Sequence, residues 1–529
     1  HLFMLFAVSG SVMNAKWLWI RFLQTSVGAS VAISLYGILQ LMGVFVINQG
    51  GVRVDATLGN ATYLAGYLLL HIFFTAFLFS QKNTPTWLRT LYGVIIALHT
   101  FILFNTMTRG AILAFLGGAI LTALLLVFLS EQRAALKKYA AGVIAFIVFF
   151  TGVFIAVKDT DFVKGNQILD RLSGISLTAG HSRFLVWSIA WEGVKEKPML
   201  GWGQDNFILA FSKHYNPRMY SEEPWFDRAH NIVLDWLIAG GALALLAYMS
   251  IYIALLYALW FYRRESDVGR VERDFGLEPF SIPEKSILTG LFAAYLFHNL
   301  FVFDNVVSYI FFFSVLAFIH QSSTQNRPRM LNHLPRVTIG VGGKESTERF
   351  LAPLVLIALV FSLYFLNIKS ILGNTALLDA IDLRAAQSAG SPEERESLLR
   401  NNLRAFQKSL EGGFLGRMET LEQLTQVTSN MTAAPVSQIL KQEFFTLAHS
   451  EMKKQIEKAP DNLRARMFTS SLLIHYRLFD EAIIELEKAR TVSDKKQDIH
   501  FLLVNAYLGQ GNLEKALEVG KFTFELEPG

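Results

Sequence analysis

Long apolar runs are the feature that most limits what this chain can fold into. Crossing the roughly 30 Å hydrocarbon core of a bilayer takes about 20 largely apolar helical residues. Nine segments have this character, and they cover residues 18–47, 58–79, 89–108, 110–129, 139–157, 232–261, 286–303, 305–320 and 351–369. With 52% hydrophobic and 17% charged residues, the composition excludes a water-soluble globular protein of this size. We therefore expect an all-α, polytopic transmembrane helical bundle.

The first ten residues, HLFMLFAVSG, resemble the end of a tenth span. The chain begins at His1, and neither a charged leader nor a small-residue cleavage site marks this stretch as a signal peptide. We therefore expect that N-terminal helices are missing from this sequence.

Lysine and arginine are distributed unevenly between the two sides of the predicted bundle. They gather in loops on one side, such as 263–273 and 327–349, whereas the opposite short loops hold only Arg53 and Arg109. Because cytoplasmic loops retain positive charge, the first side is expected to be cytoplasmic. Loop 158–231 and everything after about residue 370 then lie outside the cytoplasm. This bias also accounts for the pI near 9.1, so we expect no nucleic-acid partner.

Four regions follow from these patterns. The composition becomes polar and helix-forming after about residue 370, and the long loop interrupts the spans. The expected domains are N-terminal transmembrane helices 1–157, an extracytoplasmic loop 158–231 with short amphipathic helices, C-terminal transmembrane helices 232–369, and an extracytoplasmic helical domain 370–529.

The end of the chain repeats at a period of 34 residues. Phe479 corresponds to Leu513 and Ala482 to Ala516. The pattern AYLGQGNLEKALEVGKFTFELEP, with RLFDEAIIELEKA as a looser copy, resembles the TPR family. The resemblance implies an α-solenoid, clearest over 461–529, that binds a peptide or protein partner and continues beyond the last residue of this sequence.

The loop between the fifth and sixth spans is unusually long, at about 74 residues against a median connection of roughly 4–6. It carries nine basic and nine acidic residues, so an anion site there must come from geometry and not from bulk charge. Its aromatic residues favour the membrane interface. They are Trp187, Trp191, Trp202, Tyr215, Tyr220, Trp225 and Phe226.

Three residues are candidates for chemistry, each with a structural alternative. Arg109 sits in a hairpin between two spans, where it either anchors the topology by snorkelling or has a functional partner. Arg183 opens an amphipathic helix and either pairs with an acid such as Glu192 or binds an anion. His230 lies where the chain re-enters the membrane and is either a capping or core histidine or a base.

The order of several short motifs favours the functional role of these residues over the structural one. Four motifs, taken in order, resemble the O-antigen ligase and polymerase family. They are TRGA, HSRFLVW about 74 residues later, KPMLGWGQDNF, and AHN at the head of an apolar helix. VRVDATLGNATYLAGYLLL and HNLFVFD also resemble family landmarks, so the resemblance covers roughly residues 20–320. The family attaches or extends glycans carried on undecaprenyl pyrophosphate.

The resemblance implies a metal-independent membrane glycosyltransferase without a cofactor. The family's essential arginines fall on Arg109 and Arg183, whose forked guanidinium groups suit a pyrophosphate leaving group. The family's histidine falls on His230, as a base or as a positioning group for the acceptor. The further substrate-binding candidates are Arg53, Arg218, Arg228 and Asn231; for the three arginines a topology or salt-bridge role, with Asp55 in the case of Arg53, is at least as well supported.

The acceptor stays open between a glycolipid (ligase), another lipid-linked glycan (polymerase) and a protein hydroxyl. A transporter of lipid-linked glycans is a rival class, but repeated halves and midplane charges are not evident. A membrane-anchored TPR scaffold is another, although one span would suffice for anchoring. The expected location is the bacterial inner membrane, with the loop and the TPR-like domain on the periplasmic or extracellular side.

Overall fold

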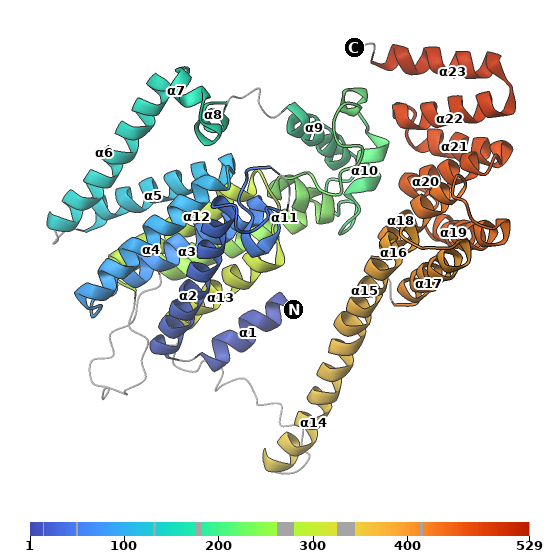
Figure 1. The fold of residues 1–529 in the computed structure, drawn as a ribbon. Coiled ribbons are helices and arrows are strands. Elements are labelled where there is room, and N and C mark those ends of the chain that lie inside the picture. Colours follow the sequence, from blue (N-terminus) through green and yellow to red (C-terminus); the bar gives the residue numbers. More distant parts are fainter. Residues whose placement is uncertain are drawn as a thin grey trace. The chain divides into compact units, whose positions relative to one another are not determined.

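The described part of this chain is built from helices. The computed structural model describes residues 1–13, 15–48, 51–130, 134–174, 181–261, 280–324, 344–412 and 416–527, and no strand occurs within these ranges. The chain divides into two compact units, shown in Figure 1. Unit 1 comprises His1–Phe207 and Asp227–Met330, and unit 2 comprises Ile208–Phe226 and Leu331–Gly529. The all-α expectation is confirmed.

Unit 1 contains the apolar helices of the first two thirds of the chain. In chain order its helices are α1 (Leu2–Val12), α2 (Lys16–Leu41), η1 (Ala56–Leu58), α3 (Ala61–Phe79), α4 (Thr86–Asn105), α5 (Arg109–Leu129), α6 (Ala134–Val157), α7 (Asp161–Lys164), α8 (Gln167–Ser173), α9 (His181–Glu196), α11 (Ile232–Trp260), α12 (Ile282–Asn299) and α13 (Val306–Thr324).

Eight helices in the described ranges are long and apolar enough to cross a membrane. They correspond to eight of the nine predicted spans and make this a multi-pass membrane protein. The remaining predicted span, 286–303, falls on α12, which is not among the eight. The first turn of α12 carries Glu284 and Lys285. Because α12 packs against α3 and α5, most of its surface faces protein, so it can be more polar than a lipid-facing span. The helix expected at the first ten residues, α1, has 11 residues and is shorter than a span.

The bundle of unit 1 is packed around aromatic side chains. Trp19 stacks on Phe318 with ring centroids 5.2 Å apart, and Phe77 contacts Phe318 edge-on at 5.8 Å. By contrast, α6 exposes apolar residues such as Phe146 and Phe149. An exposed apolar helix is unfavourable in water but matches the hydrocarbon of a bilayer.

The long helix α11 is broken in the middle. Gly240 has φ −148° and Gly241 has φ 65° with ψ −161°, a conformation that essentially only glycine adopts. The backbone groups freed by the break bond to the loop that follows α9. Trp202 N donates to Ile238 O at 2.6 Å, and Ala242 N donates to Pro198 O at 2.8 Å. The break therefore fastens the loop to the helix that begins just after His230.

Unit 2 begins its main part with a continuous helix and ends with a series of helices that pack in sequence order (Figure 1). Its helices are α10 (Phe207–Lys213, whose first residue belongs to unit 1), η2 (Pro217–Met219), α14 (Lys344–Leu363), the π-helical turn η4 (Tyr364–Ile368), α15 (Lys369–Ile381), α16 (Arg384–Gln387), α17 (Pro392–Glu411), α18 (Arg417–Met431), α19 (Gln438–Lys458), α20 (Leu463–His475), α21 (Phe479–Val492), α22 (Gln497–Gln510) and α23 (Leu513–Leu526).

The last four helices repeat at the period read from the sequence. The starts of α20 and α22 are 34 residues apart, as are the starts of α21 and α23. Small residues pack where these helices meet, since Ala482, Ala489, Ala506 and Ala516 are all buried in one core. The expected loop domain 158–231 is divided between the units, because residues 208–226 cluster with the C-terminal helices.

Candidate active site

Four arginines from separate stretches of unit 1 lie close together: Arg53, Arg109, Arg171 and Arg183. Arg109 Nε donates to Arg171 O at 2.7 Å, and Arg171 Nε donates to Met107 O at 3.2 Å. Partial burial lowers the pKa of Arg53, and repulsion from Arg171 and Arg183 lowers it further. Partial burial likewise lowers the pKa of Arg183, with a further contribution from Arg109. We call these four residues the arginine cluster.

The arginine cluster is not neutralised by neighbouring acids. Within the described ranges of unit 1, no carboxylate forms an ion pair with any of its four guanidinium groups. Arg171 is exposed, Arg183 is partly covered but keeps solvent-exposed surface, and Arg53 and Arg109 are half-buried, so the charges remain accessible. Asp170 offsets part of the charge around Arg109, but the four neighbouring cations repel one another and create a local potential that attracts an anion.

Two members of the cluster stand at the starts of helices. Arg109 is the first residue of α5, and Arg183 lies in the first turn of α9. A cation is unfavourable there because the helix N-terminus carries partial positive charge, and the same end offers unpaired N–H groups to an anion. Met107, two residues before Arg109, has φ 51°, a strained value for its type. Both the helix-end cations and the backbone of Met107 are therefore locally unfavourable.

Arg53 is held in a fixed orientation by the loop that precedes α5. Its Nε donates to Thr106 O at 3.0 Å, and one terminal nitrogen donates to the hydroxyls of Thr108 at 3.2 Å and Thr62 at 3.4 Å. Asp55, the alternative partner considered from the sequence, accepts a hydrogen bond from Gln40 Nε2 at 2.7 Å. These contacts orient Arg53 without neutralising its charge.

His230 lies at the entry to α11 in a constrained backbone conformation. Its φ is 53°, and its ring lies 5.1 Å from that of Phe303. The preceding residue is fixed from two sides, since Ala229 O accepts from Trp187 Nε1 at 3.0 Å and Ala229 N donates to Asp235 Oδ1 at 2.8 Å. Partial burial lowers the pKa of His230 below 6.5, and Arg183 and Arg228 lower it further, against an opposing effect of Asp227. The imidazole is therefore neutral at pH 7 and able to accept a proton.

The remaining predicted residues have identifiable structural partners. Arg228 pairs with Asp205 at 3.0 Å and lies 5.4 Å from the Phe303 ring centroid. Asn231 is the N-cap of α11, where its side chain accepts from the backbone N–H groups of the first turn at 3.0 and 3.2 Å. Arg218 belongs to unit 2, where it lies 4.0 Å from Glu527. Arg53, Arg109, Arg183 and His230 are therefore the predicted site residues that unit 1 brings together.

Arg171 was not singled out from the sequence, yet its side chain donates to Met107 O and its own carbonyl accepts from the Arg109 side chain. In the sequence it follows Asp170 in a short polar stretch, which is typical of a solvated helix face. A Cβ at Gly174, three residues after Arg171, would lie 3.0 Å from an Arg109 terminal nitrogen. That closeness is a property of the fold and has no signature in the local pattern.

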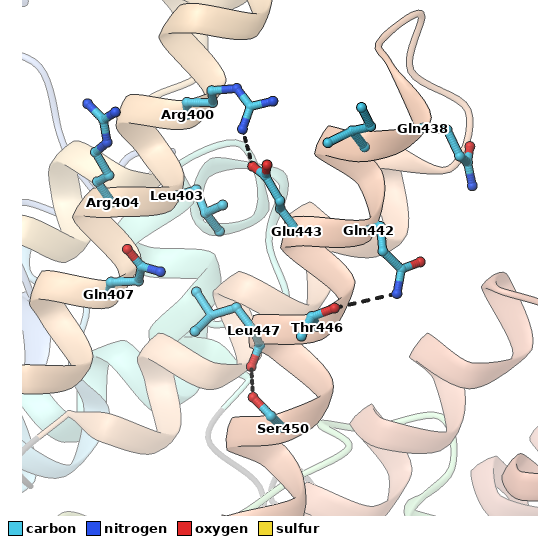
Figure 2. Close-up of a pocket in the computed structure, with 11 residues that line it drawn as sticks. Arg400, Leu403, Arg404, Gln407, Gln438, Gln442, Glu443, Thr446, Leu447 and Ser450 are labelled. Atoms are coloured by element: carbon cyan, nitrogen blue, oxygen red, sulfur yellow. Dashed lines mark hydrogen bonds and ion pairs between the residues drawn. The ribbon is translucent and has the colours of Figure 1, made fainter.

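Two cavities differ in what they can do chemically. A hollow of about 790 Å³ lies between α17 and α19 of unit 2, and Figure 2 shows its wall of glutamines and aliphatic residues, with Arg400 paired to Glu443. A smaller cavity of about 60 Å³ in unit 1 is lined by Asp205, Asp227, Arg228 and Asp304 among others. The hollow in Figure 2 carries one further basic residue, Arg404, beside the Arg400–Glu443 pair. Because the arginine cluster gathers four cations close to His230, we assign the candidate site to the arginine cluster and His230.

Fold and site together define a polytopic helical membrane protein with a concentrated cationic site beside a neutral histidine. Comparison with known families narrows this class. Residues 92–249 match the family model described as O-Antigen ligase, so this part of the chain is similar to that family. The match includes Arg109, Arg171, Arg183 and His230.

A similarity to one characterised protein points in the same direction. The chain is 28% identical over 113 residues to a "General O-oligosaccharyltransferase" of Acinetobacter baylyi (strain ATCC 33305 / BD413 / ADP1). The match spans 21% of this chain and 19% of that protein. Both descriptions are of glycan-transferring enzymes.

Proposed function

We propose that this protein transfers a glycan from an undecaprenyl-pyrophosphate carrier to an acceptor hydroxyl, at the outer face of the bacterial inner membrane. The arginine cluster carries this proposal, because a pyrophosphate-linked donor brings two phosphates that accessible guanidinium forks can bind bidentately. The similarity of residues 92–249 to the O-antigen ligase family supports the reaction class. The side of the membrane rests on the lysine and arginine bias of the loops.

In the proposed reaction the bond between the sugar C1 and the pyrophosphate oxygen breaks, and a bond forms between C1 and the acceptor oxygen. Negative charge develops on the departing undecaprenyl pyrophosphate, where Arg109, Arg183, Arg171 and Arg53 stabilise it more strongly than in the bound donor. The acceptor proton passes to His230, which is neutral at pH 7. In the alternative role, His230 only positions the acceptor or the pyrophosphate by hydrogen bonding.

The acceptor is the part of the proposal that an experiment must decide. We favour a ligase-type reaction, and the partial similarity to an O-oligosaccharyltransferase keeps a protein hydroxyl as a specific alternative, beside polymerisation of lipid-linked glycan. We expect purified protein supplied with undecaprenyl-pyrophosphate glycan, together with lipid A core and a candidate protein acceptor, to consume the donor. Mass spectrometry of the products identifies a glycolipid, a longer glycan or a glycoprotein. Unchanged donor with all acceptors would overturn the transferase and favour a transporter or a scaffold.

The pH dependence of transfer tests the role of His230. Because its pKa lies below 6.5, the neutral form predominates at pH 7 and is lost as the pH falls through that pKa. We expect kcat/KM to be flat from about pH 7 to 8 and to fall by about tenfold for each further pH unit below the pKa. His230→Ala should lack this acidic limb and lower transfer more than donor binding. Equal loss of transfer and donor binding in this variant would assign His230 the positioning role instead.

We further propose that the C-terminal helical repeats form a TPR-like domain on the outer side of the membrane. The 34-residue offset of α20 and α21 against α22 and α23 supports this assignment. Stacked helix pairs of this kind present extended surfaces to peptides and proteins, so a protein partner or the acceptor itself is the expected ligand.

A further inference from the structure

Within unit 2, the internal segment 208–226 lies against the C-terminal helices and is hydrogen-bonded to them. Lys496 Nζ donates to Pro224 O at 2.8 Å, and Gln497 Nε2 donates to Pro217 O at 3.0 Å. The bonded residues are more than 270 positions apart in the chain. Both donors sit at the start of α22, so one end of this helix holds two points of the segment.

Lys496 occupies an enclosed aromatic site. Its side chain is 1% exposed and pairs with Asp498 at 3.0 Å. The ammonium lies 4.4 Å from the ring centroid of Tyr215 and 4.6 Å from that of Trp225, both in the segment. Burying an ammonium is unfavourable unless it is paired and hydrogen-bonded, and aromatic faces add favourable electrostatic contact. The segment supplies two aromatic faces and one carbonyl to satisfy this charge.

Further contacts extend the surface beyond Lys496. The rings of Tyr220 and Phe501 lie 5.5 Å apart, and the Arg464 guanidinium lies 5.8 Å from the Trp225 centroid. Trp225 packs against the buried core of α20–α23. The surface therefore combines the starts of α20 and α22 with one exposed face of α22.

The internal repeat shows that Lys496 is an unfavourable residue type for the N-cap position of its helix. Lys496 is the N-cap of α22 and makes no side-chain cap, and a cation is unfavourable at a helix N-terminus. One repeat earlier, the equivalent position is Asn462, whose side chain caps α20 by accepting from Ala465 N at 3.0 Å. Asn512 caps α23 in the same way. Lys496 makes no side-chain cap and instead contacts the segment 208–226.

We propose that the surface around Lys496 is a docking site for the chain's own segment 208–226, and that docking restrains both ends of the loop near the candidate active site. The residues that flank the segment, Asp205–Phe207 and Asp227–His230, belong to unit 1. They include the Asp205–Arg228 pair and His230. Release of the segment frees these flanking residues, which makes the C-terminal helices a positioning element for the loop.

Lys496→Asn tests docking without removing a helix cap, since it recreates the Asn462 arrangement. In the full-length protein in detergent, we expect unchanged helix content and cleavage by a glutamate-specific protease at Glu222–Glu223 that is about tenfold faster than in the parent. The matched control is Lys495→Asn, a neighbouring exposed lysine, which should be cleaved at the parental rate. Parental cleavage of Lys496→Asn would overturn the docking site.

The absence of cysteine from the sequence allows a second test. Tyr220→Cys with Phe501→Cys should be joined by a short bifunctional thiol reagent, whereas Tyr220→Cys with Ile439→Cys, an exposed position on α19, should not. Equal cross-linking of both pairs would contradict docking at α22.

The effect on transfer rests on the proposed function, whereas cleavage and cross-linking do not. We expect Lys496→Asn to lower the transfer rate by about tenfold and the Tyr220–Phe501 cross-link, added to that variant, to restore it. A released segment with parental transfer would overturn the positioning role while leaving the docking site in place. Failure of the parent protein to consume donor would instead count against the proposed function.

Discussion

Replacing Arg183 with lysine should lower glycan transfer by about 100- to 1,000-fold while leaving membrane insertion unchanged. Lysine keeps the positive charge but replaces a planar fork of donors with a single ammonium, so it cannot bind two phosphate oxygens in parallel. Arg183 starts α9 beside Arg109 and has no acidic partner in the described ranges. Its fork is therefore available to the leaving group. The initial rate of donor consumption by purified protein measures the effect.

Arg384→Lys is the control for this substitution. Arg384 has an 88% exposed side chain that pairs with Asp382, and an exposed pair of this kind contributes little to stability. We expect parental transfer in this variant. A parental rate in Arg183→Lys, with both proteins equally well folded, would show that the arginine cluster does not act through bidentate phosphate binding.

The helical architecture could be predicted because the membrane demands a simple local signal. Each lipid-facing helix must be apolar along about 20 residues, so α2 to α6 are visible in the sequence one by one. The span 286–303 was predicted as well and falls on α12, whose start is polar because the helix packs against α3 and α5. The break at Gly240 and Gly241 was missed. Glycine is frequent in membrane helices, and only the loop bonded to Ile238, Ala239 and Ala242 reveals the break.

The candidate site was predicted only as far as motif order allowed. Arg109, Arg183 and His230 lie in separate motifs whose order carried the resemblance, and unit 1 brings them together. Arg171 escaped notice because its role depends on a hydrogen bond from the Arg109 side chain to its carbonyl, between residues 62 positions apart. The division of the loop 158–231 between the two units could not be predicted either, since the bond from Lys496 to Pro224 joins positions 272 residues apart. Such long-range pairings leave no local periodicity.

Gly241→Ala should destabilise the membrane domain by at least about 3 kcal/mol. A Cβ at this position would lie 2.2 Å from the carbonyl carbon of Met199 and 2.3 Å from its oxygen. Both atoms are backbone, so they cannot move away as a flexible side chain could. The φ of 65° with ψ of −161° adds strain for any residue other than glycine. We expect a lower yield of monodisperse protein in detergent and a melting temperature well below that of the parent.

Gly142→Ala separates this effect from a general response of membrane helices to a methyl group. Gly142 lies in α6, and a Cβ there would meet no atom within 4 Å. Alanine is better than glycine inside a helix by about 0.5–1 kcal/mol, so this variant should melt at or slightly above the parental temperature. If Gly241→Ala behaved like Gly142→Ala, the loop after α9 would not be fastened through the break. Because α11 begins two residues after His230, loosening that attachment should also disturb the histidine, and transfer by the surviving folded protein should fall with it.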